Sequence, residues 1–231
     1  MNGNSAAGIA LAILAFVIAV ILHELAHGYA ARALGDHTAA QAGRLSFNPI
    51  SHIDRFGSVA LPLMLYLGQM LTMGQVGFMF GWAKPVPVDP SQFRYPRQGM
   101  ALVAAAGPAC NFILAFIGAL GLTAFGQQGA MGQFFIDFIE FNLLLGLFNL
   151  LPLPPLDGGR IAVGILPARL AYGYAQIERA GILTILVLVL VLPWALGQVG
   201  IRFDPVHAVL DRLVPGIGNA MLTLAGAHAR F

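Results

Sequence analysis

Long runs of apolar residues, separated by short polar connections, dominate the chain. The first run predicts a helix from about Ala6 to Leu34, and two further runs predict membrane spans over Gly99–Phe125 and Phe134–Leu151. A fourth run, Ile182–Leu196, is short but adequate for a span if its charged neighbours lie at the lipid headgroups. Because helices satisfy their own backbone hydrogen bonds in lipid, the pattern predicts an all-α polytopic membrane protein.

Three stretches break this apolar pattern. Residues 37–57 are polar and are expected to form a connection without a helix. The apolar run Val59–Phe80 is interrupted by Pro62 and by glycines, and we expect it to be a re-entrant or hairpin segment. The stretch Gly81–Pro90 has prolines at alternate positions, which force an extended backbone. Such a backbone near a membrane must be buried in protein or line a wet cavity.

The C-terminal part of the chain is less regular. Residues Ile161–Tyr174 read as a half-helix or interfacial piece, since Pro167 and Arg169 interrupt them. Residues Val206–Ala229 predict an amphipathic or kinked final helix. We therefore expect a single integral membrane domain over residues 1–231, with a core over about 5–160 and additional helices over about 161–231.

The composition supports a membrane protein and excludes some partners. Hydrophobic residues make up 58% of the chain and charged residues 10%, against about 25% charged residues in ordinary globular proteins. The net charge is only +2 and no basic run is present, so the lipid bilayer, not nucleic acid, is the expected partner. The single cysteine, Cys110, lies in an apolar stretch and is expected to serve packing.

A metal-binding pattern lies close to the end of the first apolar run. His23 and His27 are four residues apart, so both imidazoles lie on one face of a helix and can reach one zinc ion. Glu24, between them, is placed to take a proton from a water that the metal activates. Ionisable residues inside a membrane segment are costly unless they serve a function. The pattern therefore predicts a metal-dependent hydrolase.

A catalytic zinc ion needs a third protein ligand. The four other histidines lie in polar connections or in the weakest predicted helix: His37, His52, His207 and His228. Asp137 and Glu140 lie at the start of the third span and Asp157 lies past its end, so they fall on opposite sides of the membrane. Asp157 is a short carboxylate held among prolines and glycines in apolar surroundings, where it would be costly without a partner. We therefore predict Asp157 as the third ligand.

The distribution of positive charge predicts an orientation. No basic residue precedes the first span, whereas Arg32, Arg44 and Arg55 follow it, which places its motif-bearing end toward the cytoplasm. If Asp157 joins the histidines on that side, the connection that carries Lys84 is cytoplasmic as well. The run Val59–Phe80 must then enter and leave on the same side.

Three motifs together resemble the site-2 protease family of intramembrane zinc metalloproteases. They are HELAH at residues 23–27, AGPACN at 106–111 and FNLLPLPPLDGGR at 148–160. The resemblance covers about residues 5–160 and is greatest to the compact bacterial branch, which has segments similar to GWAKPVPV and lacks PDZ and CBS domains. It implies a core of three membrane helices with a re-entrant or extended segment and additional C-terminal helices.

The resemblance also implies roles for individual residues. His23, His27 and Asp157 would hold one Zn²⁺ per chain, and Glu24 would be the general base. Asn149 would help to hold the scissile carbonyl or its oxyanion. Among candidate substrate-binding residues, Asn111 is either structural or substrate-facing, and Asn142 lies in the third span. Val86 and Val88 belong to the extended segment, which we expect to receive a substrate by β-addition.

The expected function is intramembrane proteolysis. By the resemblance, the substrates are transmembrane proteins, usually trimmed first by another protease, and their cleavage releases a regulator. The compact form indicates a prokaryotic inner membrane, with the site toward the cytoplasm. Two alternatives remain. A membrane-embedded zinc hydrolase with a non-peptide substrate fits the same ligands, and only a substrate assay separates it from a protease. A transporter is less favoured, because it would normally show repeats or ionisable groups along several spans.

Overall fold

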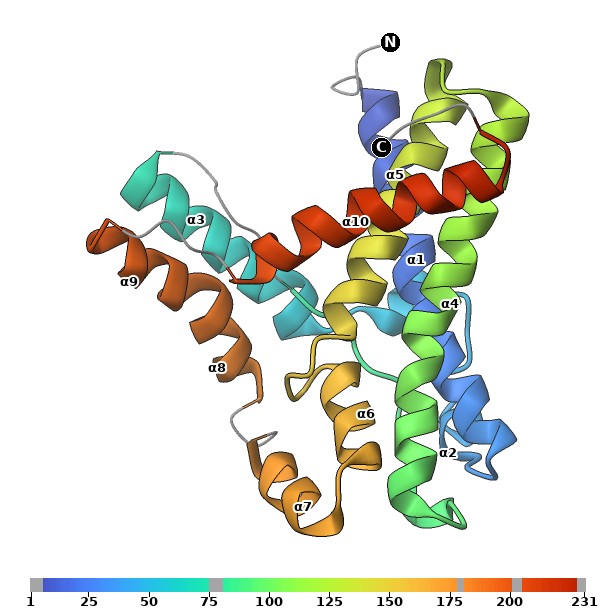
Figure 1. The fold of residues 1–231 in the computed structure, drawn as a ribbon, viewed down its shortest axis with the longest axis vertical. Coiled ribbons are helices and arrows are strands. Elements are labelled where there is room, and N and C mark those ends of the chain that lie inside the picture. The colour runs from blue at the N-terminus through green and yellow to red at the C-terminus, as the bar shows by residue number, and fades with distance from the viewer. Residues whose placement is uncertain (1–5, 75–80, 178–180, 201–204, 228–231) are drawn as a thin grey trace.

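Three long helices form the centre of the molecule. The structure is a computed structural model that describes residues 6–74, 81–177, 181–200 and 205–227. Helices α1 (Ala6–Ala33), α4 (Pro96–Phe125) and α5 (Gly129–Asn149) pack against one another (Figure 1). In the described part of the chain, these are the three continuous helices that are long and apolar enough to cross a membrane, and no β-strand is present there. The predicted all-α membrane fold is confirmed.

Small residues explain why these helices pack closely. The buried positions of α1 include Ala15 and Ala19, and those of α4 include Gly107, Ala115 and Gly118. Between membrane helices, small side chains let the backbones approach and gain van der Waals contact. Large apolar side chains on both helices remain exposed, for example Ile9, Phe16 and Ile113. Such faces suit contact with lipid.

The segment between α1 and α4 leaves the bundle and returns to the same place. Helix α3 (Leu61–Met73) has 13 residues and follows directly on a π-helical turn over Arg55–Ala60. The two ends of the excursion meet, because the Trp82 N–H donates to the Gly57 carbonyl at 3.2 Å and the Ser58 hydroxyl donates to the Trp82 carbonyl at 2.8 Å. That this segment enters and leaves the membrane on one side stays a prediction, which the meeting of its two ends supports.

The polar connection after α1 contains short helical turns that the sequence did not predict. They are α2 (Thr38–Gln41), a 3₁₀ turn (Pro49–His52) and a π-helical turn (Arg55–Ala60). Two of them are capped: the Asn48 side chain accepts from the Ile50 N–H, and Asp54 accepts from the N–H groups of Phe56 and Gly57. These caps satisfy the N–H groups that a short turn leaves unpaired. The expectation of no helix over residues 37–57 was therefore wrong at the level of single turns.

After α5 the chain folds into two short helices where one interrupted piece was expected. Helix α6 (Asp157–Ile165) begins at the candidate metal ligand, and α7 (Ala168–Ile177) follows after a break at Leu166 and Pro167. Proline disfavours a helical conformation in the preceding residue, and Leu166 is accordingly extended, with ψ of 149°. The proline thus separates two helices within residues 157–177.

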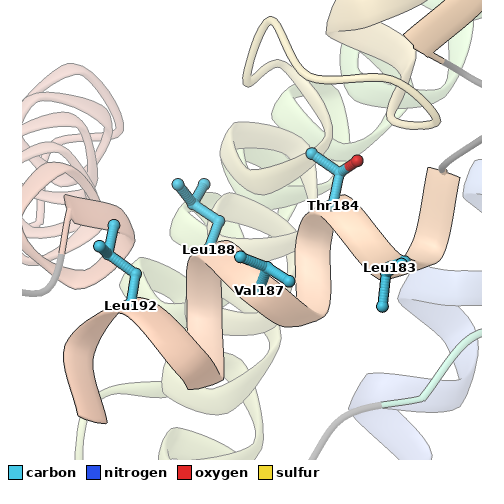
Figure 2. A pocket seen from close by; sticks show the side chains of 5 residues that line it. All are labelled: Leu183, Thr184, Val187, Leu188 and Leu192. Atoms are coloured by element: carbon cyan, nitrogen blue, oxygen red, sulfur yellow. The ribbon is translucent and has the colours of Figure 1, made fainter. Parts of the chain in front are cut away.

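The apolar run that was expected to span over residues 182–196 is helical in three consecutive pieces. Helix α8 (Gly181–Leu186) continues through a π-helical turn (Val187–Val191) into α9 (Leu192–Gln198). An open hollow of about 340 Å³ lies along them (Figure 2), lined by Leu183, Thr184, Val187, Leu188 and Leu192. The lining has no ionisable side chain and none of the predicted site residues. The hollow therefore offers an apolar surface but no hydrolytic chemistry.

The final helix, α10 (Pro205–Leu224), packs on α5 and α4 and crosses them in Figure 1. Its buried side chains recur every four residues, at Val206, Leu210 and Val214, and belong to the same apolar core as Leu143 of α5. This spacing is that of one helix face. The predicted amphipathic final helix is present, and the part of the prediction beyond residue 227 lies outside the described residues.

Candidate metal centre

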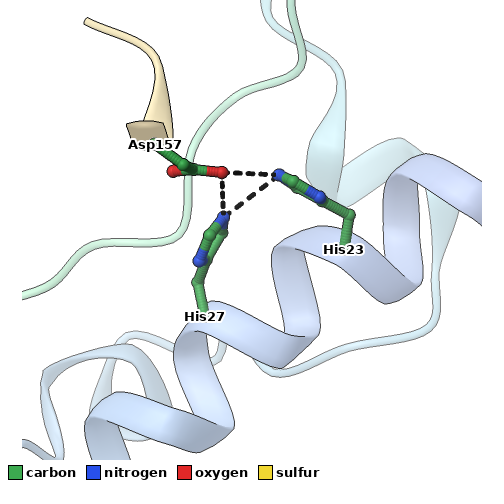
Figure 3. Close-up of side chains that lie close together, drawn as sticks. All are labelled: His23, His27 and Asp157. Carbon is green, nitrogen blue, oxygen red and sulfur yellow. Dashed lines mark hydrogen bonds and ion pairs between the residues drawn. The ribbon is translucent and has the colours of Figure 1, made fainter. Parts of the chain in front are cut away.

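Three side chains from two distant parts of the chain meet at one point. His23 and His27 extend from α1, and Asp157 extends from the first turn of α6 (Figure 3). Each histidine Nε2 lies 3.3 Å from Asp157 Oδ2, and the two Nε2 atoms lie 3.1 Å apart. The side chains are only 6%, 12% and 9% exposed, in the order His23, His27 and Asp157. The structure thus brings together the three predicted zinc ligands.

The spacing of the three atoms fits a tetrahedral zinc ion. Zinc bonds to nitrogen and oxygen ligands of about 2.0–2.2 Å at tetrahedral angles place the ligand atoms about 3.3 Å apart. Asp157 Oδ2 is buried and has no hydrogen-bond partner among the described residues. A buried carboxylate oxygen without a partner is costly, and a cation at this point would satisfy it. The donor set, its spacing and the unpaired oxygen all fit Zn²⁺.

The second nitrogen of each histidine is held by a hydrogen bond. His27 Nδ1 lies 2.8 Å from the Val103 carbonyl of α4. A carbonyl oxygen only accepts, so Nδ1 carries the proton and the Nε2 lone pair points to the centre. His23 Nδ1 lies 2.6 Å from Asn111 Oδ1, which fixes the same tautomer. With both Nε2 atoms and Asp157 Oδ2 as acceptors, the three groups favour a cation between them.

A buried chain of amides supports His23 from behind. Asn111 donates through Nδ2 to Asn142 Oδ1 at 2.8 Å, and the Asn142 amide donates to the Phe138 carbonyl at 2.8 Å. Both asparagines have 0% exposure. Polar side chains in the interior of a membrane protein need such partners. This geometry favours an orienting role for Asn111 and Asn142 over direct contact with a substrate.

Replacement of Asn111 by leucine should therefore weaken zinc binding without removing a ligand. The variant would leave the Nδ1–H of His23 without its acceptor and Asn142 Oδ1 without its donor, and loss of such an outer hydrogen bond typically costs about 10–100-fold in metal affinity. Zinc affinity measured by competition with a chelator checks this. As a control, Asn219→Leu changes an asparagine on α10 and should leave zinc affinity within about twofold. Equal affinity of the Asn111 and Asn219 variants would contradict the orienting role.

Glycines allow other parts of the chain to approach the site. A Cβ at Gly107 of α4 would lie 2.5 Å from His27 Nε2 and 2.6 Å from His23 Cε1. On the Asp157 side, a Cβ at Gly158 would overlap the carbonyl oxygens of Leu150 and Leu151. The backbones of α4 and of the turn before α6 therefore lie in direct contact with the site. Any larger residue at Gly107 or Gly158 would displace its neighbours there.

Glu24 lies beside the histidines and contacts the extended segment. Its Oε2 accepts a hydrogen bond from the Val86 N–H at 3.0 Å. The Val86 side chain is 7% exposed and faces Gly28 of α1, where a Cβ would lie 3.0 Å from Val86 Cγ1. Val88 packs against a cluster that includes Ala31 and Val103. The side chains of both valines therefore face protein.

Other predicted site residues have hydrogen bonds of their own. Asn149, half-buried at the end of α5, donates from its amide to the Leu145 carbonyl, one turn earlier. This bond uses one of the two amide hydrogens and leaves the other for a ligand. Of the loop histidines, His52 is buried and its Nε2 contacts the Ser46 carbonyl at 2.8 Å. Neither His37 nor His52 belongs to the metal-binding group of the described residues.

Sequence reasoning missed the backbone groups and the small residues of the site. The Val103 carbonyl and the Val86 N–H have no signature in their side chains, so only the fold reveals them. Gly107 carried a signal, because it lies in the AGPACN motif, where small residues permit close contact between helices. That contact is with the two imidazoles themselves.

Comparisons with known proteins give one family. The sequence profile of peptidase family M50 matches residues 125–192, which include Asn149 and Asp157. Several relatives bear the name "Putative zinc metalloprotease", among them proteins of Bacillus subtilis and Mycolicibacterium smegmatis. YwhC of Bacillus subtilis is 42% identical over 185 residues, covering 76% of this chain and 78% of the relative. Rip2 of Mycolicibacterium smegmatis is 29% identical over 226 residues, covering 96% and 80%.

A more distant relative comes from an archaeon. Zinc metalloprotease MJ0392 of Methanocaldococcus jannaschii is 29% identical over 174 residues, covering 75% of this chain and 38% of the relative. No solved structure gives a significant match. The profile is that of a peptidase family, and the relatives are named as zinc metalloproteases. Zinc is also the metal that the spacing of His23, His27 and Asp157 fits.

Proposed function

Since this chain belongs to peptidase family M50, whose members found here are named as zinc metalloproteases, we propose that it hydrolyses peptide bonds within or near transmembrane segments of substrate proteins. The observation that carries the proposal is the convergence of His23, His27 and Asp157 on one point beside a membrane helix. Three buried acceptors with an unpaired carboxylate oxygen suit a catalytic zinc with an open fourth position. We propose one Zn²⁺ per chain.

Different residues of the chain would serve different steps of hydrolysis. Zn²⁺ at this point would lower the pKa of a water to about 7 and polarise the scissile carbonyl. Glu24 accepts the proton of the attacking water and returns it to the leaving amine. Asn149, through its remaining amide hydrogen, donates to the oxygen on which negative charge develops. The burial of the site excludes bulk water and strengthens these interactions.

The extended segment would receive the substrate through its backbone. The N–H groups of Trp82, Lys84 and Val86 are used on the side of α1 and the α1–α3 connection. In an extended chain the backbone groups of the alternate residues point the other way. That edge carries Pro85 and Pro87, which offer carbonyls but no N–H. A locally unwound substrate would therefore donate its own N–H groups to the carbonyls of this edge. This is a form of β-addition in which the two prolines only accept hydrogen bonds.

The membrane location follows in the same way. Three candidate spans and membership of family M50 indicate an integral membrane protein. The basic residues at and after the end of α1, including Arg32 and Arg44, support an orientation with the HELAH end of α1 toward the cytoplasm under the positive-inside rule. We propose a prokaryotic inner membrane protein that cleaves near the cytoplasmic side and takes part in regulated intramembrane proteolysis.

Cleavage of a model single-span protein by the purified chain in detergent tests the proposal. We expect cleavage that is lost when a chelator removes zinc and restored when zinc is added back, and mass spectrometry of the products should place the cut within or beside the apolar segment. Cleavage that persists after zinc is removed would contradict the metal-dependent mechanism. Bound zinc without cleavage of any of several single-span proteins would instead support a zinc hydrolase with a non-peptide substrate.

A further inference from the structure

The extended segment, residues 81–89, is attached to the rest of the molecule by four of its backbone N–H groups. Its bonds are Trp82 N–H to Gly57 O at 3.2 Å, Lys84 N–H to His52 O at 2.8 Å, Val86 N–H to Glu24 Oε2 at 3.0 Å and Asp89 N–H to Asp36 Oδ2 at 2.8 Å. The first two acceptors are backbone carbonyls, whereas the last two are carboxylates, Glu24 within α1 and Asp36 just beyond its end. Glu24 and Asp36 thus hold the second half of the segment.

Asp36 is a rigid anchor for the end of this segment. It has 0% exposure, and each carboxylate oxygen accepts one backbone N–H: Oδ1 from Thr38 at 2.8 Å and Oδ2 from Asp89 at 2.8 Å. Burial alone would raise the pKa of the Asp36 carboxyl, but hydrogen bonds from Thr38 and from the Asp89 N–H hold that pKa below its usual value. The group is therefore ionised at neutral pH and joins α2 to the extended segment.

Asp89, whose N–H Asp36 holds, lies three residues after Val86, whose N–H contacts Glu24. Extended residues rise about 3.3 Å each, so fixing Asp89 and Lys84 leaves the intervening Val86 little freedom to slide along α1. Two features support this register: Pro85 and Pro87 stiffen the backbone, and the Val86 side chain lies against Gly28. Val86 N–H is thereby presented to Oε2 of Glu24.

This N–H has a direct effect on the proposed general base. A glutamate side chain has several rotatable bonds, and holding it in one geometry costs side-chain entropy. A bond to one carboxylate oxygen fixes the plane of the group and leaves the other oxygen, Oε1, to accept a proton. Pre-organised groups of this kind lose less free energy on reaching the transition state. The contact therefore suits orientation of a working base.

We propose that Asp36 is a positioning residue for Glu24: by anchoring Asp89, it keeps the extended segment in the register in which the Val86 N–H orients the Glu24 carboxylate. The inference rests on the proposed role of Glu24 as general base. Asp36 itself lies one helical turn or more beyond the HELAH motif and touches none of the three candidate zinc ligands in the described contacts.

Amide hydrogen exchange tests the contact without any need for activity. Pro85 and Pro87 have no amide hydrogen, so Val86 carries the only amide between Lys84 and Val88, and its exchange is measured at single-residue resolution. Asp36→Asn keeps only one acceptor oxygen for two N–H groups, and we expect the Val86 amide to exchange at least about tenfold faster in this variant. Glu24→Ala, which removes the acceptor, should do the same.

A matched control exists in the same connection. Asp54 also accepts two backbone N–H groups, but both bonds go to one oxygen, Oδ1, which an asparagine retains. Asp54→Asn should therefore leave Val86 exchange within about twofold of the native rate. If Asp36→Asn and Asp54→Asn exchange alike at Val86, the proposal is overturned.

Kinetics separate a positioning role from a merely structural one. With a single-span substrate, Asp36→Asn should lower kcat by about tenfold, leave KM within about twofold and leave one zinc bound per chain, because only the base is misaligned. Val86→Pro, which removes the N–H itself, should reproduce this pattern. A rise in kcat would mean that the segment blocks the base, and loss of zinc would mean a structural role; either result overturns the proposal.

The two levels of inference fail separately. If the native chain cleaves no substrate, the proposed function fails, while the exchange of Val86 in the Asp36 variant still decides whether Asp36 controls the contact with Glu24. If the native chain cleaves its substrate and both Asp36→Asn and Val86→Pro match Asp54→Asn in kcat, the proposed function stands and the positioning role of Asp36 is excluded.

Discussion

Replacement of Glu24 by glutamine is expected to reduce peptide hydrolysis by about 10²–10⁴-fold while zinc stays bound at the native stoichiometry. The magnitude is that of removing a general base, and it enters kcat because the proton is transferred in the reaction step. Glutamine has nearly the same shape, and its carbonyl oxygen can still accept the Val86 N–H, so the extended segment should remain in place. The measurements are kcat and zinc content of the same preparation.

A second glutamate provides the matched control for this variant. Glu140 lies on α5, a candidate membrane helix, and is not one of the residues that converge on the site. Glu140→Gln makes the same chemical change and should leave kcat within about twofold. If Glu24→Gln retains the native kcat with zinc bound, Glu24 is not the base and the proposed division of roles is wrong.

The long-range features of this molecule follow from its apolar pattern. Of the four spans that were predicted, three are present as the continuous helices α1, α4 and α5, within about five residues of the expected ends. The predicted meeting of Asp157 with His23 and His27 needed only two physical ideas, that an unpaired carboxylate in apolar surroundings is costly and that ligands must share one side of the membrane. These ideas depend on residue type and on topology, both of which are readable from sequence.

The groups that orient the site could not be predicted in this way. His27 is held by the carbonyl of Val103, and Glu24 by the N–H of Val86, and every residue offers such groups. Their use depends on the register between segments 62 and 76 residues apart, which helix periodicity does not set. The roles of Asn111 and Asn142 were open for the same reason, because a buried amide is equally consistent with a partner in the protein and with a bound substrate.

Gly107→Ala is expected to weaken zinc binding by at least about 10²-fold and to reduce cleavage to a similar extent. The added methyl group would lie 2.5 Å from His27 Nε2 and 2.6 Å from His23 Cε1, well inside normal contact distance. The imidazoles cannot readily move aside, because their Nδ1 atoms are hydrogen-bonded to the Val103 carbonyl and to Asn111. Displacement of a ligand or reacting group by about 1 Å can cost about 10²-fold in rate.

The sign of this prediction distinguishes it from a general effect on the helix. Alanine in place of glycine inside a helix normally stabilises it by about 0.5–1 kcal/mol, so α4 by itself should tolerate or favour the change. Gly173→Ala on α7, where no atom lies within 4 Å of the added Cβ, is the control and should retain native zinc affinity and cleavage. Native zinc affinity in the Gly107 variant would show that α4 does not press on the imidazoles, and the close approach of α4 to α1 at the site would then be wrong.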